Sequence, residues 1–146
     1  EGIRALGFSV KLDTNGSRPE MLERLLTREL LNYVAIDIKS SPNRYRDATG
    51  GKLDFAVVAE AVAKVKVSKI PYELRTTAVP GIVDLEDIAM IAQELGTVER
   101  FALQQFRSKK TLDPSFRGTR TYPQSWFEKA RELLQGKAAE VLVRGI

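Results

Sequence analysis

Apolar positions along the chain follow two spacings in turn, one of two residues and one of three to four. The two-residue spacing predicts five strands, over residues 8–13, 33–39, 72–79, 100–106 and 140–145. Between these segments, the longer spacing predicts amphipathic helices. Each predicted helix begins at a capping signal: "SRPE" at 17–20, Asp54, Asp84 and "SWFE" at 125–128.

Strands that alternate with helices are typical of βα units, which build a parallel sheet through right-handed crossovers. We therefore predict an α/β fold over residues 1–146, a partial (β/α) barrel that is TIM-barrel-like, or an open sheet. Asn15-Gly16 would also suit a hairpin turn, but the segment after it has helical spacing, so a turn into a helix is favoured. The opening "EGIRALGF" is typical of a helix that ends just before Gly7, and we expect the chain to be a piece of a longer protein.

Two predicted loops, 40–52 and 108–123, are long for a compact domain. Both follow the carboxyl ends of predicted strands, where the active sites of α/β proteins lie. The second loop carries Arg117, Arg120 and Tyr122. A solvated loop is the simpler interpretation of these residues, and contact with a protein partner is the functional one.

Charged residues gather on one face of three predicted strands. Side chains alternate across a strand, so residues two apart share a face. Three acids and three bases share it: Lys11, Asp13, Asp37, Lys39, Glu73 and Arg75. Unpaired buried ions are costly, so these groups must pair with one another or with a ligand. The pattern predicts a polar cleft for a ligand that carries charges of both signs; a sheet with one solvated face is the alternative.

Composition excludes several kinds of chemistry. The 146 residues include no cysteine and no histidine, which leaves no disulfide, thiolate nucleophile or Ser-His-Asp triad and few options for zinc. The 23 basic and 19 acidic residues are interspersed, so a nucleic-acid surface is not favoured. No apolar run approaches the roughly 18 residues that cross a bilayer, and a cytoplasmic location is the default expectation.

Four segments, taken in order, resemble the later strands of a radical S-adenosylmethionine (SAM) enzyme. They are "KLDTNG" at 11–16, "AIDIK" at 35–39, "ELRTTAVPGIVD" at 73–84 and "LQQFR" at 103–107. The resemblance is strongest to the activating enzymes of glycyl radical enzymes, which include those of pyruvate formate-lyase and of anaerobic ribonucleoside-triphosphate reductase. It implies a partial barrel of which residues 1–146 form the C-terminal part.

The resemblance also implies cofactors. In the family, three cysteines hold a four-iron, four-sulfur cluster, and SAM bound to it yields a 5′-deoxyadenosyl radical that takes a hydrogen atom from a glycine of the partner enzyme. The cysteines and the Gly-Gly-Glu segment of the family are absent from this sequence. We therefore expect the parent protein to be the active oxidoreductase and this piece alone to be inactive.

Individual residues match functional positions of the family. Asp13, Thr14 and Asp37, with the backbone carbonyl of Ala35, match ligands of a monovalent cation beside the cofactor carboxylate, and oxygen ligands suit such an ion. Lys39 matches a lysine that contacts the cofactor near its carboxylate. The resemblance thus assigns Asp37 to both the cation and the cofactor.

The remaining predicted cofactor contacts come from later strands. Arg75 and Thr77 match the lining of the cofactor and substrate cleft, although Arg75 could equally serve to neutralise Glu73 or Asp37. Arg107 stands where a relative has a cofactor-contacting histidine, which is a departure from the family. Gln105 could substitute for that contact.

Other functions stay open from the sequence alone. One is a cysteine-free binding module for a nucleotide or phosphate, although no Gly-x-Gly-x-x-Gly or Walker loop is present.

The partner that the resemblance implies is a glycyl radical enzyme, and we expect no nucleic acid and no membrane. A sheet edge left open by missing early strands would also permit a homodimer.

Overall fold

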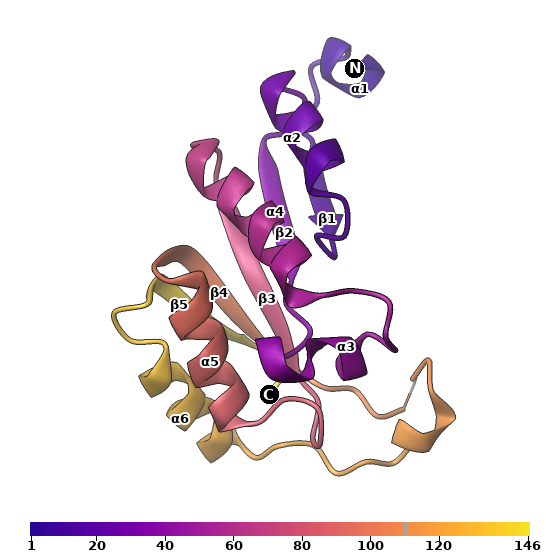
Figure 1. Ribbon diagram of the computed structural model, residues 1–146, viewed down its shortest axis with the longest axis vertical. Helices are drawn as coiled ribbons and strands as arrows, with labels where there is room; N and C mark the ends of the chain where they lie inside the picture. The colour runs from indigo at the N-terminus through magenta and orange to yellow at the C-terminus, as the bar shows by residue number, and fades with distance from the viewer. Residues whose placement is uncertain (110) are drawn as a thin grey trace.

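The computed structural model describes residues 1–109 and 111–146, so Lys110 of the predicted second loop lies outside the described residues. Its strands form one parallel sheet in the order of the sequence (Figure 1). They are β1 (Lys11–Thr14), β2 (Tyr33–Asp37), β3 (Tyr72–Ala78), β4 (Val98–Gln105) and β5 (Ala138–Arg144). The predicted α/β alternation and parallel sheet are confirmed, and β1 and β5 lie at the two edges.

The longer helices lie along one face of this sheet (Figure 1). They are α2 (Pro19–Thr27), α4 (Phe55–Val67), α5 (Leu85–Leu95) and α6 (Gln124–Leu133). Short helical turns complete the chain: α1 (Gly2–Ala5), η1 (Pro42–Arg44), α3 (Tyr45–Ala48) and η2 (Pro114–Phe116). None of the helices in this described part is long and apolar enough to cross a membrane.

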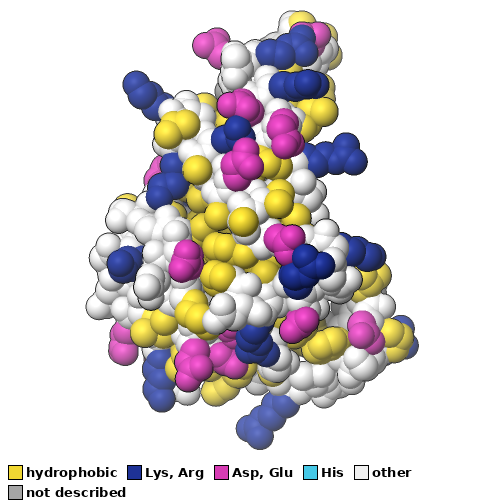
Figure 2. Space-filling view, viewed as in Figure 1, with side chains coloured by type: hydrophobic (Ala, Val, Ile, Leu, Met, Phe, Trp, Pro, Cys, Tyr) yellow, Lys and Arg dark blue, Asp and Glu magenta, His cyan; other side chains and the backbone are white. Residues whose placement is uncertain are grey.

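The hydrophobic core lies between the sheet and these helices. Ile36, Leu74 and Leu103 point from the central strands into it and are fully buried, as are Val58 of α4 and Ile88 of α5. Figure 2 shows the side of the molecule that the helices cover, where hydrophobic side chains gather in the middle and charged ones surround them. Because one set of strand side chains fills the core, the alternate set is left for the opposite face.

Two predicted helix caps are wrong. The N-cap of α2 is Arg18, not Ser17, and no side chain caps the helix. The Ser17 amide donates to Asn15 Oδ1 (3.1 Å), so Ser17 belongs to the turn before the helix. The second predicted box began at Ser125, but α6 begins one residue earlier, at Gln124. Pro123 there has the extended backbone of an N-cap, so Ser125 falls inside the first turn.

The other two predicted caps are at the right positions. The Asp84 and Asp87 side chains form a reciprocal capping box at the start of α5. Asp54 is the N-cap of α4, but its carboxylate accepts from Arg46 Nη1 (2.8 Å) rather than from the helix. These caps fix where each helix starts relative to the strand before it.

Candidate functional site

The strand register brings the predicted charged residues together on one face of the sheet. Asp13 lies beside Ala35, Ala35 beside Glu73, and Asp37 beside Arg75. Partners in a parallel register point to the same side, so the side chains from β1, β2 and β3 project from the face opposite the core. The prediction that these strands share one charged face is confirmed.

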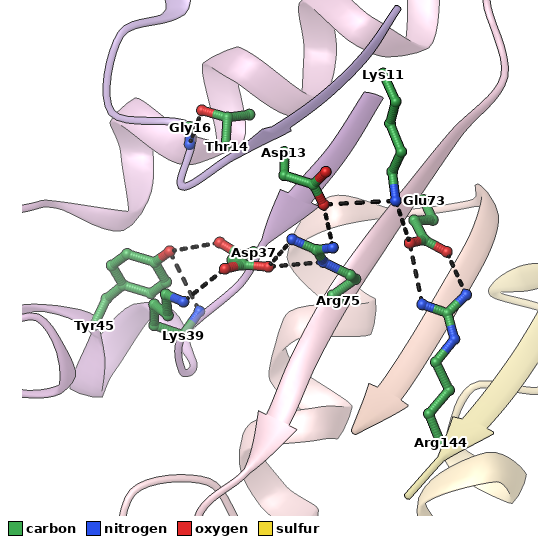
Figure 3. A network of polar contacts seen from close by, with 10 residues as sticks. All are labelled: Lys11, Asp13, Thr14, Gly16, Asp37, Lys39, Tyr45, Glu73, Arg75 and Arg144. Carbon is green, nitrogen blue, oxygen red and sulfur yellow. Dashed lines mark hydrogen bonds and ion pairs between the residues drawn. The ribbon is translucent and has the colours of Figure 1, made fainter. Parts of the chain in front are cut away.

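Arg75 joins the acids of the first two strands. Its Nε donates to Asp37 Oδ1 (2.9 Å), and its Nη1 donates to Asp13 Oδ1 (Figure 3). Lys39 Nζ pairs with the other oxygen of Asp37 at 2.8 Å. Burial alone would lower the pKa of Arg75, but Asp37 and Asp13 outweigh it and raise that pKa. The guanidinium therefore stays charged between two carboxylates.

Glu73 is the buried acid of a second group of ion pairs on the same face, which it forms with Arg144 and Lys11. Its side chain is only 2% exposed and accepts from Arg144 Nη2 (2.8 Å) and Nη1 (3.2 Å). Lys11 Nζ lies 3.9 Å from Glu73 and 3.6 Å from Asp13, so it links the two halves (Figure 3). Burial would raise the pKa of Glu73, but the bonds from Arg144 and the nearby bases lower it overall.

We call the following seven residues the charged cluster: Lys11, Asp13, Asp37, Lys39, Glu73, Arg75 and Arg144. It contains four bases and three acids. Six of these residues lie on β1, β2, β3 and β5, and Lys39 follows the end of β2. Asp13 and Lys11 are about half exposed, whereas Arg75 is 16% exposed. A bound ligand could reach the outer members without disturbing Glu73.

A cleft of about 880 Å³ opens at the carboxyl ends of the first strands. It is lined by Asn15 after β1, Lys39 after β2 and Gly81 after β3, and by residues of both long loops. Lys39 belongs to both the charged cluster and this cleft. Both long loops, which the sequence places after the carboxyl ends of strands, contribute residues to this lining.

The other predicted site residues lie at a second, smaller pocket or at the turn after β1. A pocket of about 390 Å³ is lined by Thr77, Arg107 and Arg144 together with Gln104 and its neighbours. The register pairs Thr77 with Gln104, so Gln104 rather than Gln105 shares its face. Gln105 instead donates to the Tyr122 carbonyl (2.8 Å).

Thr14 caps its own turn. Its Oγ1 accepts the Gly16 amide at 3.1 Å (Figure 3). Together with the bond from Ser17 to Asn15, this shows that "DTNG" ends the strand with turn chemistry. The cation role predicted for Asp13, Thr14 and Asp37 stays a prediction, and the guanidinium of Arg75 already lies between the two carboxylates.

Sequence reasoning missed two members of this site. Arg144 belongs to the last predicted strand, and its alternation with Glu140 and Leu142 could have placed it on the same face as Glu73. Tyr45 lies in the first long loop, and its hydroxyl reaches the backbone of Asp37 and Lys39. No local pattern marked that contact, because it depends on how the loop folds back.

The fold and this site define an α/β protein with a cleft at the carboxyl ends of its strands and a charged cluster beside it. Residues 1–95 match the family model described as "Radical SAM superfamily". The chain therefore belongs to the radical SAM superfamily.

Two of the known proteins that are similar to it show what it resembles. One is "Putative glycyl-radical enzyme activating enzyme" of Methanocaldococcus jannaschii, 36% identical over 115 residues; the match covers 76% of this chain and 48% of that relative. The chain thus spans about half the length of that relative. The other is a crystal structure of a domain of pyruvate-formate lyase-activating enzyme from Bacteroides vulgatus, with a TM-score of 0.74 at 16% identity. That match covers 97% of this chain and 84% of the other, and it shows the shared fold.

The residues present fit one of the family's two cofactors. The amino-acid part of SAM carries charges of both signs, and the exposed oxygens of Asp13 and the Lys39 ammonium offer partners of both signs. An iron–sulfur cluster requires thiolates, and this sequence has no cysteine. Among the residues that the structure describes, no three His, Cys, Asp or Glu side chains are grouped to hold a metal ion. These 146 residues thus supply no ligand set for the cluster.

Proposed function

We propose that the protein containing this chain is a radical SAM activating enzyme for a glycyl radical enzyme, and that residues 1–146 form the C-terminal part of its partial barrel. Family membership and the relative from M. jannaschii support this. The observation that carries the proposal is the charged cluster, in which three neighbouring strands converge on Arg75 beside a cleft. When bound, SAM and the iron–sulfur cluster supply a 5′-deoxyadenosyl radical that removes a hydrogen atom from a partner glycine.

This chain's own residues would bind and orient SAM. Lys39 would bind the cofactor carboxylate, because its ammonium is 43% exposed and lies at the border of the cleft and the charged cluster. Asp37 is placed to bind a cationic part of the cofactor, because Lys39 and Arg75 leave it 29% exposed. Arg75 and Thr77 would line the adjacent wall, toward the smaller pocket.

The contacts at the fourth strand are less direct. Arg107 borders the smaller pocket and is exposed, so it could reach a ligand phosphate or carboxylate there. Gln105 is engaged with the Tyr122 carbonyl and would have to release it to contact the cofactor. Gln104 lies on the face of Thr77 and is the better placed amide.

A monovalent cation would use Asp13, Thr14 and Asp37. Two of these side chains already neutralise Arg75, so such a cation competes with the guanidinium for the same oxygens. Cation binding and Arg75 position are then coupled, because a guanidinium and a metal ion cannot both occupy the space between Asp13 and Asp37.

The partner enzyme would approach over the two long loops. They border the 880 Å³ cleft, where Phe116 and Ile82 offer apolar surface and Arg44 and Lys52 offer charge. A glycine-bearing loop of the partner must reach the cofactor, and this cleft opens next to Lys39. Homodimer formation by the 146-residue chain alone, through the outer edge of β1, is a separate proposal, supported by the position of β1 at the edge of the sheet.

The direct test is turnover. The complete gene product, reconstituted anaerobically with iron and sulfide, should convert SAM to 5′-deoxyadenosine when reduced. In this protein, Lys39→Met should raise the KM for SAM by about tenfold or more, because a charge-assisted contact is lost. Lys129→Met, at an exposed position on α6, should not. A product with an assembled cluster that forms no 5′-deoxyadenosine would defeat the proposal.

A further inference from the structure

Tyr45 lies where the chain leaves the sheet at the end of β2. Its hydroxyl accepts the Lys39 amide (3.3 Å) and donates to the Asp37 carbonyl (3.4 Å), as Figure 3 shows. One residue earlier, the Ile38 amide is still held by the sheet, through the Arg75 carbonyl at 2.8 Å. The Lys39 amide thus depends on a phenol from a loop, six residues further along the chain.

The ring of Tyr45 is fixed in place. It is fully buried and packs edge-on against Phe55, with ring centroids 5.4 Å apart. Burial raises the pKa of its hydroxyl to about 12, so the group keeps its proton at neutral pH. A protonated phenol can donate and accept at the same time, which is what the two backbone contacts require.

The residues before Tyr45 are anchored to a different element. Arg44 Nη1 pairs with Asp87 (2.7 Å) and Asp84 (3.2 Å) at the start of α5. Ser41 also donates to Asp87, whose side chain is 1% exposed. These contacts attach the segment just before Tyr45 to the start of α5.

We propose that Tyr45 is a positioning residue for the cofactor site. Its hydroxyl fixes the backbone on both sides of Ile38, so that the side chains of Asp37 and Lys39 project together into the charged cluster. The cofactor it serves rests on the proposed function, whereas the backbone positioning is a property of the chain alone. If Tyr45 were only a packing residue, its ring would suffice and its hydroxyl would be dispensable.

Tyr45→Phe separates these roles, because it keeps the buried ring and removes only the hydroxyl. The matched control is Tyr72→Phe: the Tyr72 hydroxyl also accepts a backbone amide, that of Glu99 (3.1 Å), but at the starts of β3 and β4. Both variants lose one hydroxyl from a buried ring. Of the two tyrosines, it is Tyr45 that adjoins Asp37 and Lys39.

The first measurement is amide hydrogen exchange in the 146-residue chain by NMR. In Tyr45→Phe, protection of the Lys39 amide should fall by roughly three- to tenfold, the range of one hydrogen bond, while Ile38 keeps its protection. In Tyr72→Phe, the Glu99 amide should lose protection and Lys39 should not. Unchanged protection of Lys39 in Tyr45→Phe would overturn the inference.

The second measurement is SAM turnover by the complete, reconstituted gene product. Tyr45→Phe should raise the KM for SAM by roughly three- to tenfold and leave kcat nearly unchanged, because ground-state positioning is lost. Tyr72→Phe should leave both values unchanged. An equal rise of KM in Tyr45→Phe and Tyr72→Phe would refute the positioning role, because it would mean that loss of either buried hydroxyl loosens the whole fold. A wild-type protein that never cleaves SAM would instead count against the proposed function, and Lys39 exchange would still decide the role of Tyr45.

Discussion

Arg144 reaches across a whole strand to hold Glu73. The two residues lie on β5 and β3, with β4 between them, yet their side chains form two hydrogen bonds of 2.8 and 3.2 Å. On β4 the residue of this face between them is Ala102, whose small side chain leaves room for the contact. Because Glu73 is 2% exposed, the ion pair ties the edge strand to the middle of the sheet.

Removing Arg144 should therefore weaken the fold. Arg144→Ala removes both hydrogen bonds to a buried carboxylate and leaves it an ion pair with Lys11 at 3.9 Å. We expect a loss of about 2 kcal/mol in the free energy of unfolding, the worth of hydrogen bonds to a charged group. Urea unfolding followed by circular dichroism measures it.

The exposed Arg131 on α6 provides the matched control. Arg131→Ala should change the free energy of unfolding by no more than about 0.5 kcal/mol. In the double variant with Glu73→Gln, much of the Arg144→Ala loss should disappear, since no buried charge remains to be paired. If Arg144→Ala cost the same in the wild-type background and in the Glu73→Gln background, the proposed coupling would be contradicted.

Stability should fall as the solution is acidified. The folded-state pKa values of Glu73 and Asp87 lie below their ordinary values, because hydrogen bonds and nearby bases outweigh the effect of burial. Both groups therefore stabilise the fold fully above the ordinary carboxyl pKa of about 4, and this stability is lost as pH falls through the lowered folded values.

The measurement is the urea midpoint at several pH values from about 7 to about 3. Wild type should lose stability below the ordinary carboxyl range, because the unfolded chain there binds more protons. Glu73→Gln should show a flatter decline, since it lacks one of the titrating groups. An equally steep decline in that variant would mean that Glu73 does not contribute.

The strands and their faces could be predicted because that information is local. Alternation within β1, β2 and β3 decides which side chains face the core, and the order of elements decides that the strands are parallel. Contacts that depend on distant pairing could not be predicted in this way. Arg144 meets Glu73 across 71 residues, and the choice between Gln104 and Gln105 is made by the register with Thr77.

Cap positions show a similar limit. Ser17 and Ser125 both stand three residues before a glutamate, which is the pattern of a capping box. In the structure, the Ser17 amide instead belongs to the turn of Asn15, and Pro123 is the N-cap of a helix that begins at Gln124, before Ser125. A short motif gives the residues that could cap a helix, and the preceding turn determines whether they do.

Arg75 should control access of a monovalent cation to Asp13 and Asp37. In Arg75→Gln both carboxylates lose their shared guanidinium. Asp37 then keeps Lys39 and Asp13 keeps the more distant Lys11, so the space between the two carboxylates is left open to a cation. We expect potassium chloride to raise the melting temperature of this variant by more than choline chloride does at equal ionic strength. Wild type should respond much less to this exchange of cations. A wild-type response as large as that of Arg75→Gln would show that the cation binds beside Arg75 and not in its place.

Asp87 should matter more than its neighbour Glu86. Asp87 accepts from Ser41, Arg44 and the Asp84 amide, and it is almost fully buried. Asp87→Asn should lower the free energy of unfolding by about 2 kcal/mol through lost capping and charge-assisted bonds. It should also speed proteolysis within residues 40–52, because the loop loses its attachment to α5.

Glu86→Gln is the control for Asp87→Asn, since Glu86 lies in the same first turn but is exposed. Its cost should stay within about 0.5 kcal/mol, with cleavage of 40–52 unchanged. If both variants lost the same stability, the effect would belong to helix-end electrostatics and not to the attachment of the loop.

A side chain at Gly16 should lower the stability of the fold. Its φ is +70°, and a Cβ there would lie 3.1 Å from Val58 Cγ1 and 3.4 Å from Ile36 Cγ2, both in the core. Gly16→Ala should cost about 2–3 kcal/mol in urea unfolding, one part from the left-handed backbone and one from crowding. Gly118→Ala isolates the first part, because Gly118 has a φ of +75° with open space around it. It should cost only about 1–2 kcal/mol. Equal losses would mean that the core yields to the new methyl group, whereas a larger loss at Gly16 would show that the turn after Asp13 is set by close contact with α4.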